Sequence, residues 1–146
     1  MLAIDTSTTS CSVALFNDGR LIAEAINTAG KTHSRHLLSM VHRILQEGGY
    51  GPMDIGGIAV TRGPGTFTGL RIGLSTVKGL ATAVQTPVVG ISSLDALAFP
   101  LRRMNFPVVA MIDARRGEVY HAQYRGDRCA TESVMSIAVS APETVA

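Results

Sequence analysis

The stretch "LAIDTSTTSCSVALFNDG", Leu2–Gly19, decides the fold class of this 146-residue chain. A short apolar run ends at Asp5, hydroxyl residues follow, and a second apolar run leads into "NDG". Short apolar runs bounded by turn residues predict strands, and the closing glycine turn predicts a β-hairpin. The same order returns in "VAMIDARRGEVYHAQYRGD", Val109–Asp127. The two stretches predict two copies of one half-domain led by a β-meander, unless the similarity of two hairpins is chance.

Strands and helices alternate between these two stretches. The pattern predicts a third strand at Leu21–Ile26, helices at 34–47, 66–85 and 93–101, and buried strands at 58–61 and 88–91. This order predicts an α/β fold with a mixed sheet. The half-domains are expected over 1–102 and 103–146, with a strand-like stretch at 129–139 in the second. That second half is expected to be truncated, because Ser140–Glu143 has the signature of a helix start and three residues follow it.

Composition excludes several classes of protein. Hydrophobic residues make up 46% of the chain and charged residues 16%, which is too apolar for a disordered protein. The formal charge of +2 gives no general signal for nucleic-acid binding. The N-terminus lacks the basic segment of a signal peptide, and no uncharged apolar run reaches the ~18 residues of a membrane span. Cys11 and Cys129 have neither metal nor redox spacing, so both are interpreted as reduced thiols of a cytoplasmic protein.

The glycine-rich stretch "TRGPGTFTGLRIGLSTVKGLATA", Thr61–Ala83, resembles a phosphate-binding loop at first sight. It has neither the Walker spacing nor the dinucleotide-binding spacing, because Gly63 and Gly65 are followed by Gly69. A glycine-rich turn before a helix still offers free N–H groups to an anion. Phosphate binding here is therefore a hypothesis of low specificity.

The helix that follows has one polar row in four, made of Arg71, Ser75, Lys78, Thr82 and Gln85. A helix on one side of a sheet needs one apolar stripe, so this helix is expected to bury a second face as well. Small residues such as Gly69, Gly73 and Thr76 predict a close approach there, because each glycine costs about 1 kcal/mol of helix stability. The neighbour is either another element of the same domain or a helix of a partner chain.

Titratable residues alone indicate few sites. Asp5 and Asp113 each end an apolar strand, where a carboxylate either holds a metal–phosphate group or caps a turn. His33 and His36 lie one helical turn apart, but no third metal ligand is near in sequence, which favours surface histidines. No Ser or Cys has the setting of a catalytic nucleophile.

The first helix is predicted to face the core through Leu37, Leu38, Val41, Ile44 and Leu45. Met40 lies off this stripe, beside His36 and Arg43. An exposed, flexible methionine at that position suits a contact with another chain.

Taken together, "LAIDTSTTSCSVALFNDG", "GPGTFTGLRIG" and "IDARRGEVY" resemble the bacterial TsaB (YeaZ) family, in order and over essentially the whole chain. The resemblance implies an actin-like (ASKHA, ribonuclease H-like) α/β fold of duplicated β-β-β-α-β-α half-domains. It also implies a role in forming N6-threonylcarbamoyladenosine (t6A) at position 37 of tRNA. In this role the chain would be a non-catalytic partner or scaffold of the paralogue TsaD, and TsaE would be a further partner. Self-pairing in isolation and contact with tRNA only through the complex are expected. ATP and a metal would belong to TsaD, and the chain would have no cofactor of its own. A nucleotide would lie at the interface that the chain shares with TsaD.

The resemblance also assigns residues. TsaD binds metal through a His-x3-His pair on its first helix; if His33 matches the first histidine, the second position is Leu37, which cannot ligate. No catalytic or metal-binding residue is therefore expected. The Asp5 turn resembles the first phosphate loop of the fold but lacks its usual glycine, which implies a vestigial loop at Asp5, Thr6, Ser7, Gly63, Gly65 and Asp113. Because the family's first two helices form the dimer contact, the resemblance implies a partner interface at His36, Met40, Arg43, Gly69, Gly73 and Thr76.

The alternative function is a metallopeptidase, after the older glycoprotease label of this superfamily. A helical His-Glu-x2-His motif would favour that function and is absent from the sequence.

Overall fold

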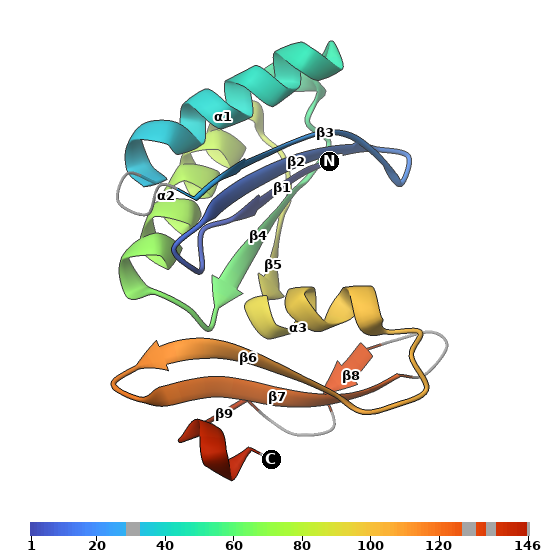
Figure 1. Cartoon of the computed structure of the whole chain (residues 1–146). Helices are drawn as coiled ribbons and strands as arrows, with labels where there is room; N and C mark the ends of the chain where they lie inside the picture. Colours follow the sequence, from blue (N-terminus) through green and yellow to red (C-terminus); the bar gives the residue numbers. More distant parts are fainter. Residues whose placement is uncertain (29–32, 127–130, 134–136, 146) are drawn as a thin grey trace. The chain divides into compact units, whose positions relative to one another are not determined.

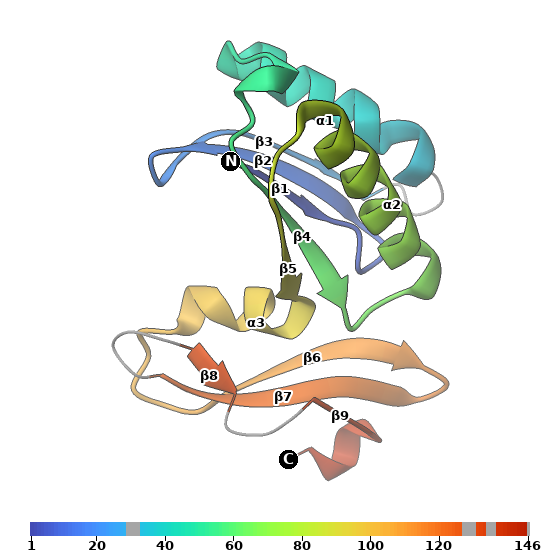
Figure 2. The same cartoon turned by 180° about the vertical axis from the view of Figure 1, so that it is seen from behind.

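The computed structural model describes residues 1–28, 33–126, 131–133 and 137–145 (Figures 1 and 2). The chain divides into two compact units, the first made of Met1–Arg62 with Thr66–Ile91 and the second of Gly63–Gly65 with Ser92–Ala146. The helix α3 (Ser93–Ala98) belongs to the second unit, whereas the sequence-based division at residue 102 places it in the first half. Each unit has a sheet and a core of its own.

The first unit is built on a five-stranded sheet in the order β3-β2-β1-β4-β5. Its strands are β1 (Leu2–Asp5), β2 (Cys11–Asn17), β3 (Arg20–Asn27), β4 (Ile58–Gly63) and β5 (Val88–Ser92). β2 pairs antiparallel with both β1 and β3, whereas β1 and β4 are parallel. The predicted opening meander and mixed sheet are confirmed.

Two helices, α1 (His33–Gly48) and α2 (Phe67–Val84), lie on one face of this sheet (Figure 1). The 3-10 segment η1 (Pro52–Asp54) follows α1. The helix α1 buries Leu37, Met40, Val41, Ile44 and Leu45. The predicted stripe is therefore wrong at one position: Leu38 is 54% exposed, whereas Met40 is 7% exposed. Leu38 and Met40 lie on opposite flanks of the stripe centred near Leu37 and Val41, so helical periodicity does not decide between them, and the packing of α1 on β2 and β3 buries Met40.

The second unit packs α3 against a sheet in which β7 (Glu118–Gly126) pairs with three neighbours (Figure 2). These are β6 (Val108–Arg115), β8 (Thr131–Ser133) and β9 (Ala138–Ser140). The predicted helix at 93–101 ends at Ala98 and continues as the 3-10 segment η2 (Phe99–Leu101). The predicted strand at 129–139 corresponds to β8 and β9, and parts of that stretch lie outside the described residues. The expected helix start near Ser140 is the 3-10 segment η3 (Pro142–Thr144).

A smaller core holds the second unit together, made of Leu94, Ala98, Ala110, Ala122 and Tyr124. The Tyr124 hydroxyl donates a hydrogen bond to Asp95 Oδ1 at 2.7 Å, which joins β7 to α3. Burial and then this contact with Asp95 raise the pKa of Tyr124 well above its usual range. The tyrosine therefore stays neutral in the fold at physiological pH.

Both units contain a hairpin whose turn has left-handed backbone. The β2–β3 turn places Asp18 at φ 48° and Gly19 at φ 75°. The β6–β7 turn places Arg116 at φ 58° and Gly117 at φ 80°, preceded by Arg115 at φ 69°. Two successive residues at positive φ are the mark of the tight turn that matches strand twist. Among the described helices, none is both long enough and apolar enough to span a membrane.

Candidate functional site

The turn after β1 is anchored by the carboxylate of Asp5. Its Oδ1 accepts hydrogen bonds from the Ser7 backbone N–H at 2.8 Å and from Thr61 Oγ1 at 2.7 Å. The Ser7 carbonyl accepts from the Thr66 N–H at 2.7 Å, which ties the turn to the start of α2. Thr6 and Ser7 are almost completely buried. Of the two roles left open for Asp5, turn capping is the one its hydrogen bonds perform.

Gly69 and Gly73 of α2, here called the glycine row, lie directly over this turn. Thr6 Oγ1 donates a buried hydrogen bond to the Gly69 carbonyl at 2.8 Å. A Cβ atom added at Gly69 would overlap the Thr6 carbonyl oxygen, and one added at Gly73 would overlap Thr6 Oγ1. Only glycine permits this approach of helix to turn.

The prediction that Gly69 and Gly73 contact another chain is therefore wrong. Both glycines are buried against Thr6 of their own unit, so the alternative of an intradomain neighbour holds. Thr76 is half-buried, and Gly79 is exposed with nothing within 4 Å of an added Cβ. The reason for the error is that a row of small residues indicates a close approach but does not identify the neighbour.

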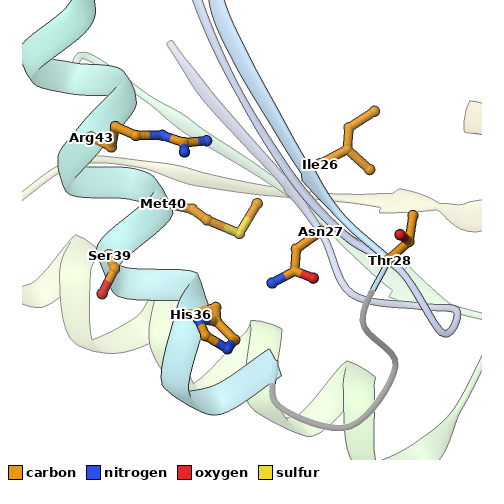
Figure 3. A pocket seen from close by; sticks show the side chains of 7 residues that line it. All are labelled: Ile26, Asn27, Thr28, His36, Ser39, Met40 and Arg43. Carbon is orange, nitrogen blue, oxygen red and sulfur yellow. The ribbon is translucent and has the colours of Figure 1, made fainter.

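A pocket of about 460 Å³ opens between α1 and the end of β3 (Figure 3). Its lining residues are Ile26, Asn27, Thr28, His36, Ser39, Met40 and Arg43. In Figure 3 the side chains of Met40 and Asn27 point toward one another from the helix and the strand. Three residues predicted for a partner interface, His36, Met40 and Arg43, thus share one pocket.

Met40 does not have the exposure that the sequence predicted for it, because it is also part of the core beneath α1. His36 and Arg43 are exposed. Arg43 Nε lies 3.6 Å from Glu47 Oε1, one turn along the helix, and both side chains are more than half exposed. An exposed pair of this kind contributes little to stability and leaves the guanidinium available to another group.

Asp113 lies two residues before the end of β6, whereas Asp5 is the last residue of β1, and the surroundings of the two aspartates differ. The Oδ1 of Asp113 accepts the Arg115 backbone N–H at 2.6 Å, and the side chain is exposed. Of the residues predicted for a vestigial phosphate loop, Asp5, Thr6 and Ser7 come together in the first unit, whereas Gly63, Gly65 and Asp113 belong to the second.

The positions considered for metal binding do not form a site in the described part of the chain. Leu37 is fully buried in the core, and His36 is exposed one residue before it. The side chain of His33 lies outside the described residues. No three His, Cys, Asp or Glu side chains among those described gather as metal ligands would.

Cys11 is buried, and burial followed by the charge of Asp5 raises the pKa of its thiol. A protonated, buried thiol of this kind is unreactive. Cys129 lies outside the described residues.

Sequence reasoning missed two features of these sites. It did not find Thr6 as the residue that the glycine row covers, although a Gly-x3-Gly helix after a strand signals a close approach to something. It also missed Asn27 on the strand side of the pocket, because no local pattern in the sequence of β3 indicates which of its side chains face α1.

Comparison with known proteins gives consistent matches. The family described as "TsaD: tRNA N6-adenosine threonylcarbamoyltransferase" matches residues 25–146. The "tRNA threonylcarbamoyladenosine biosynthesis protein TsaB" of Escherichia coli K12 is 45% identical over 129 residues, which are 87% of this chain and 55% of that protein. The protein of the same name from Bacillus subtilis is 38% identical over 125 residues, 86% of this chain and 55% of its own length. The chain thus spans about half the length of the curated relatives it matches.

Among solved structures, YeaZ from Pseudomonas aeruginosa superposes with a TM-score of 0.89 at 42% identity. The match covers 99% of this chain and 68% of that one. Both described units are therefore similar in fold to the corresponding part of YeaZ.

Proposed function

Because this chain belongs to the TsaB (YeaZ) family, we propose that it is a non-catalytic partner of TsaD in the transfer of a threonylcarbamoyl group to tRNA. It has the actin-like α/β fold expected for that family. Its relatives' names place those proteins in the biosynthesis of threonylcarbamoyladenosine on tRNA. In this proposal the chain also works with TsaE, pairs with itself in isolation, and contacts tRNA through the complex in the cytoplasm.

The observation that carries the proposal is the environment of Leu37. If His33 corresponds to the first histidine in the His-x3-His pattern of TsaD, the second position is Leu37, which is 0% exposed in the core. Because a leucine side chain has no atom that binds a metal ion, the proposal leaves the metal and ATP to TsaD, with any nucleotide held at the shared interface.

The partner surface is proposed on the outer side of α1, around the α1–β3 pocket. His36 and Arg43 are exposed there, and α1 lies beside α2, which carries the half-buried Thr76. No observation on the described residues favours the metallopeptidase alternative, since Cys11 is buried and no metal-ligand cluster is present among them.

The test combines pairing with chemistry. The purified chain is mixed with TsaD and followed by sedimentation, and t6A formation is assayed with TsaE, ATP, threonine-derived adenylate and tRNA. We expect a mixed complex that forms t6A, and no transfer by the chain without TsaD. Transfer by the chain alone, or a failure to pair with TsaD, would contradict the proposal.

A further inference from the structure

Among the described residues, the wall of the α1–β3 pocket has basic groups and no acidic ones. Its seven lining residues include Arg43 and His36 but neither Asp nor Glu. The remaining polar contributors are Asn27, Thr28 and Ser39, and Met40 gives apolar surface, whereas the side chain of Ile26 points away from α1 (Figure 3). This combination suits a group that carries a negative charge beside an apolar stem.

Within the described part of the chain, Arg43 forms a weak ion pair with Glu47. This ion pair is long, at 3.6 Å, and both side chains are exposed by more than half. An incoming carboxylate could form with Arg43 the two parallel N–H···O bonds that a guanidinium favours, and these would replace the distant contact with Glu47. Glu47, which does not line the pocket, would then act as a competitor for Arg43.

The shape of the pocket favours a protruding protein side chain over a small molecule. Pockets for small ligands bury most of the ligand's surface. Here His36, Ser39 and Arg43 are exposed, and Met40 is the one buried residue among the described lining residues. A side chain that projects from a partner surface needs no enclosure, because the rest of the interface excludes water around it.

We propose that the α1–β3 pocket receives an acidic side chain of TsaD, whose carboxylate binds Arg43 and whose stem packs on Met40. The inference rests on the proposed function and specifies the chemistry by which the partner is recognised at this surface.

The experiment measures the affinity of the chain for TsaD in four variants, with circular dichroism as a check of folding. Arg43→Glu is expected to weaken pairing at least tenfold. Glu47→Gln is expected to tighten it by about twofold, because it removes a competing pair of the strength typical for exposed i,i+4 contacts. Arg43→Lys should recover part of the affinity, since lysine keeps the charge but not the fork. Arg20→Glu in the β2–β3 hairpin makes the same change of charge away from the pocket and should leave the affinity unchanged.

Each result has a distinct meaning. If the unaltered chain pairs with TsaD while Arg43→Glu and Glu47→Gln change nothing, the inference is overturned and the proposed function stands. If the unaltered chain does not pair, both are overturned. If Arg43→Glu removes binding of ATP but leaves affinity for TsaD intact, the pocket takes a phosphate, and the carboxylate assignment is wrong. Tighter pairing of Glu47→Gln is the result that a merely structural role of Arg43 would not produce.

Discussion

Both units contain the same pattern, an apolar strand with an aspartate at or near its end before a polar turn, yet the two aspartates are held differently. Asp5 binds Ser7 and Thr61, and the next residue, Thr6, is buried beneath Gly69 of α2. Asp113 is exposed and binds the Arg115 N–H within its own hairpin. The comparison shows that a shared strand–turn–strand pattern specifies a hairpin, whereas the element packed on the turn decides whether that turn becomes part of the core.

The strongest test of this difference is Gly73→Leu. We expect the variant to lose about 3 kcal/mol or more of unfolding free energy, because the new side chain would overlap Thr6 and force α2 from the turn. The matched control is Gly79→Leu on the same helix, where the position is exposed and nothing lies within 4 Å of an added Cβ. That variant should gain up to about 1 kcal/mol from helix propensity. Urea denaturation followed by circular dichroism measures both, and equal stabilities would show that the glycine row does not need to be small.

A second test compares the two aspartates directly. Asp5→Ala should cost about 2–3 kcal/mol, because it removes a charged acceptor of two hydrogen bonds and leaves Thr61 Oγ1 without that partner. Asp113→Ala should cost about 1 kcal/mol or less, since water replaces the carboxylate at an exposed turn. Both are measured as changes in the midpoint of urea unfolding. A larger loss of unfolding free energy in Asp113→Ala than in Asp5→Ala would contradict the comparison.

The second unit has its own anchor in the Tyr124–Asp95 hydrogen bond, which gives a pH-dependent prediction. The fold raises the pKa of Tyr124 above its unfolded value of about 10, so this contribution to stability is present below about pH 10 and is lost above it. Tyr124→Phe should be about 1 kcal/mol less stable at neutral pH. Above pH 10 the difference in unfolding free energy between the unaltered protein and Tyr124→Phe should shrink. The reason is that only the unaltered protein has a tyrosine at position 124, which ionises on unfolding. A difference that stays constant with pH would contradict the role of the hydroxyl.

Much of the fold could be predicted from the sequence, because strands, turns and helices have local signals. The opening meander, α1 and α2 follow from apolar runs, the Asn-Asp-Gly turn and helical periodicity. The faces of the helices were harder to predict. Leu38 and Met40 are both apolar, and only the packing of α1 on the sheet shows which one is buried. The glycine row indicated a close approach, but Thr6 lies more than sixty residues earlier in the chain, and no local pattern pairs residues at that separation. The pocket combines α1 with β3 in the same non-local way.

The smallest expected effect comes from the two hairpin turns, which share a backbone but not a sequence. The β2–β3 turn has Asp18 before its glycine at φ 48°, a residue that tolerates left-handed backbone. The β6–β7 turn has Arg116 at φ 58°, where a long side chain gives no such local advantage. Arg116→Asn should therefore raise the unfolding free energy by up to about 1 kcal/mol, since Asn-Gly is a preferred pair for this turn. Asp18→Asn, the matched exchange in the first unit, should be nearly neutral, and Asp18→Arg should lower stability by a similar amount. Thermal unfolding by circular dichroism resolves these shifts. If Arg116→Asn instead destabilises the protein, the arginine side chain makes a contribution to the second unit that outweighs its turn preference.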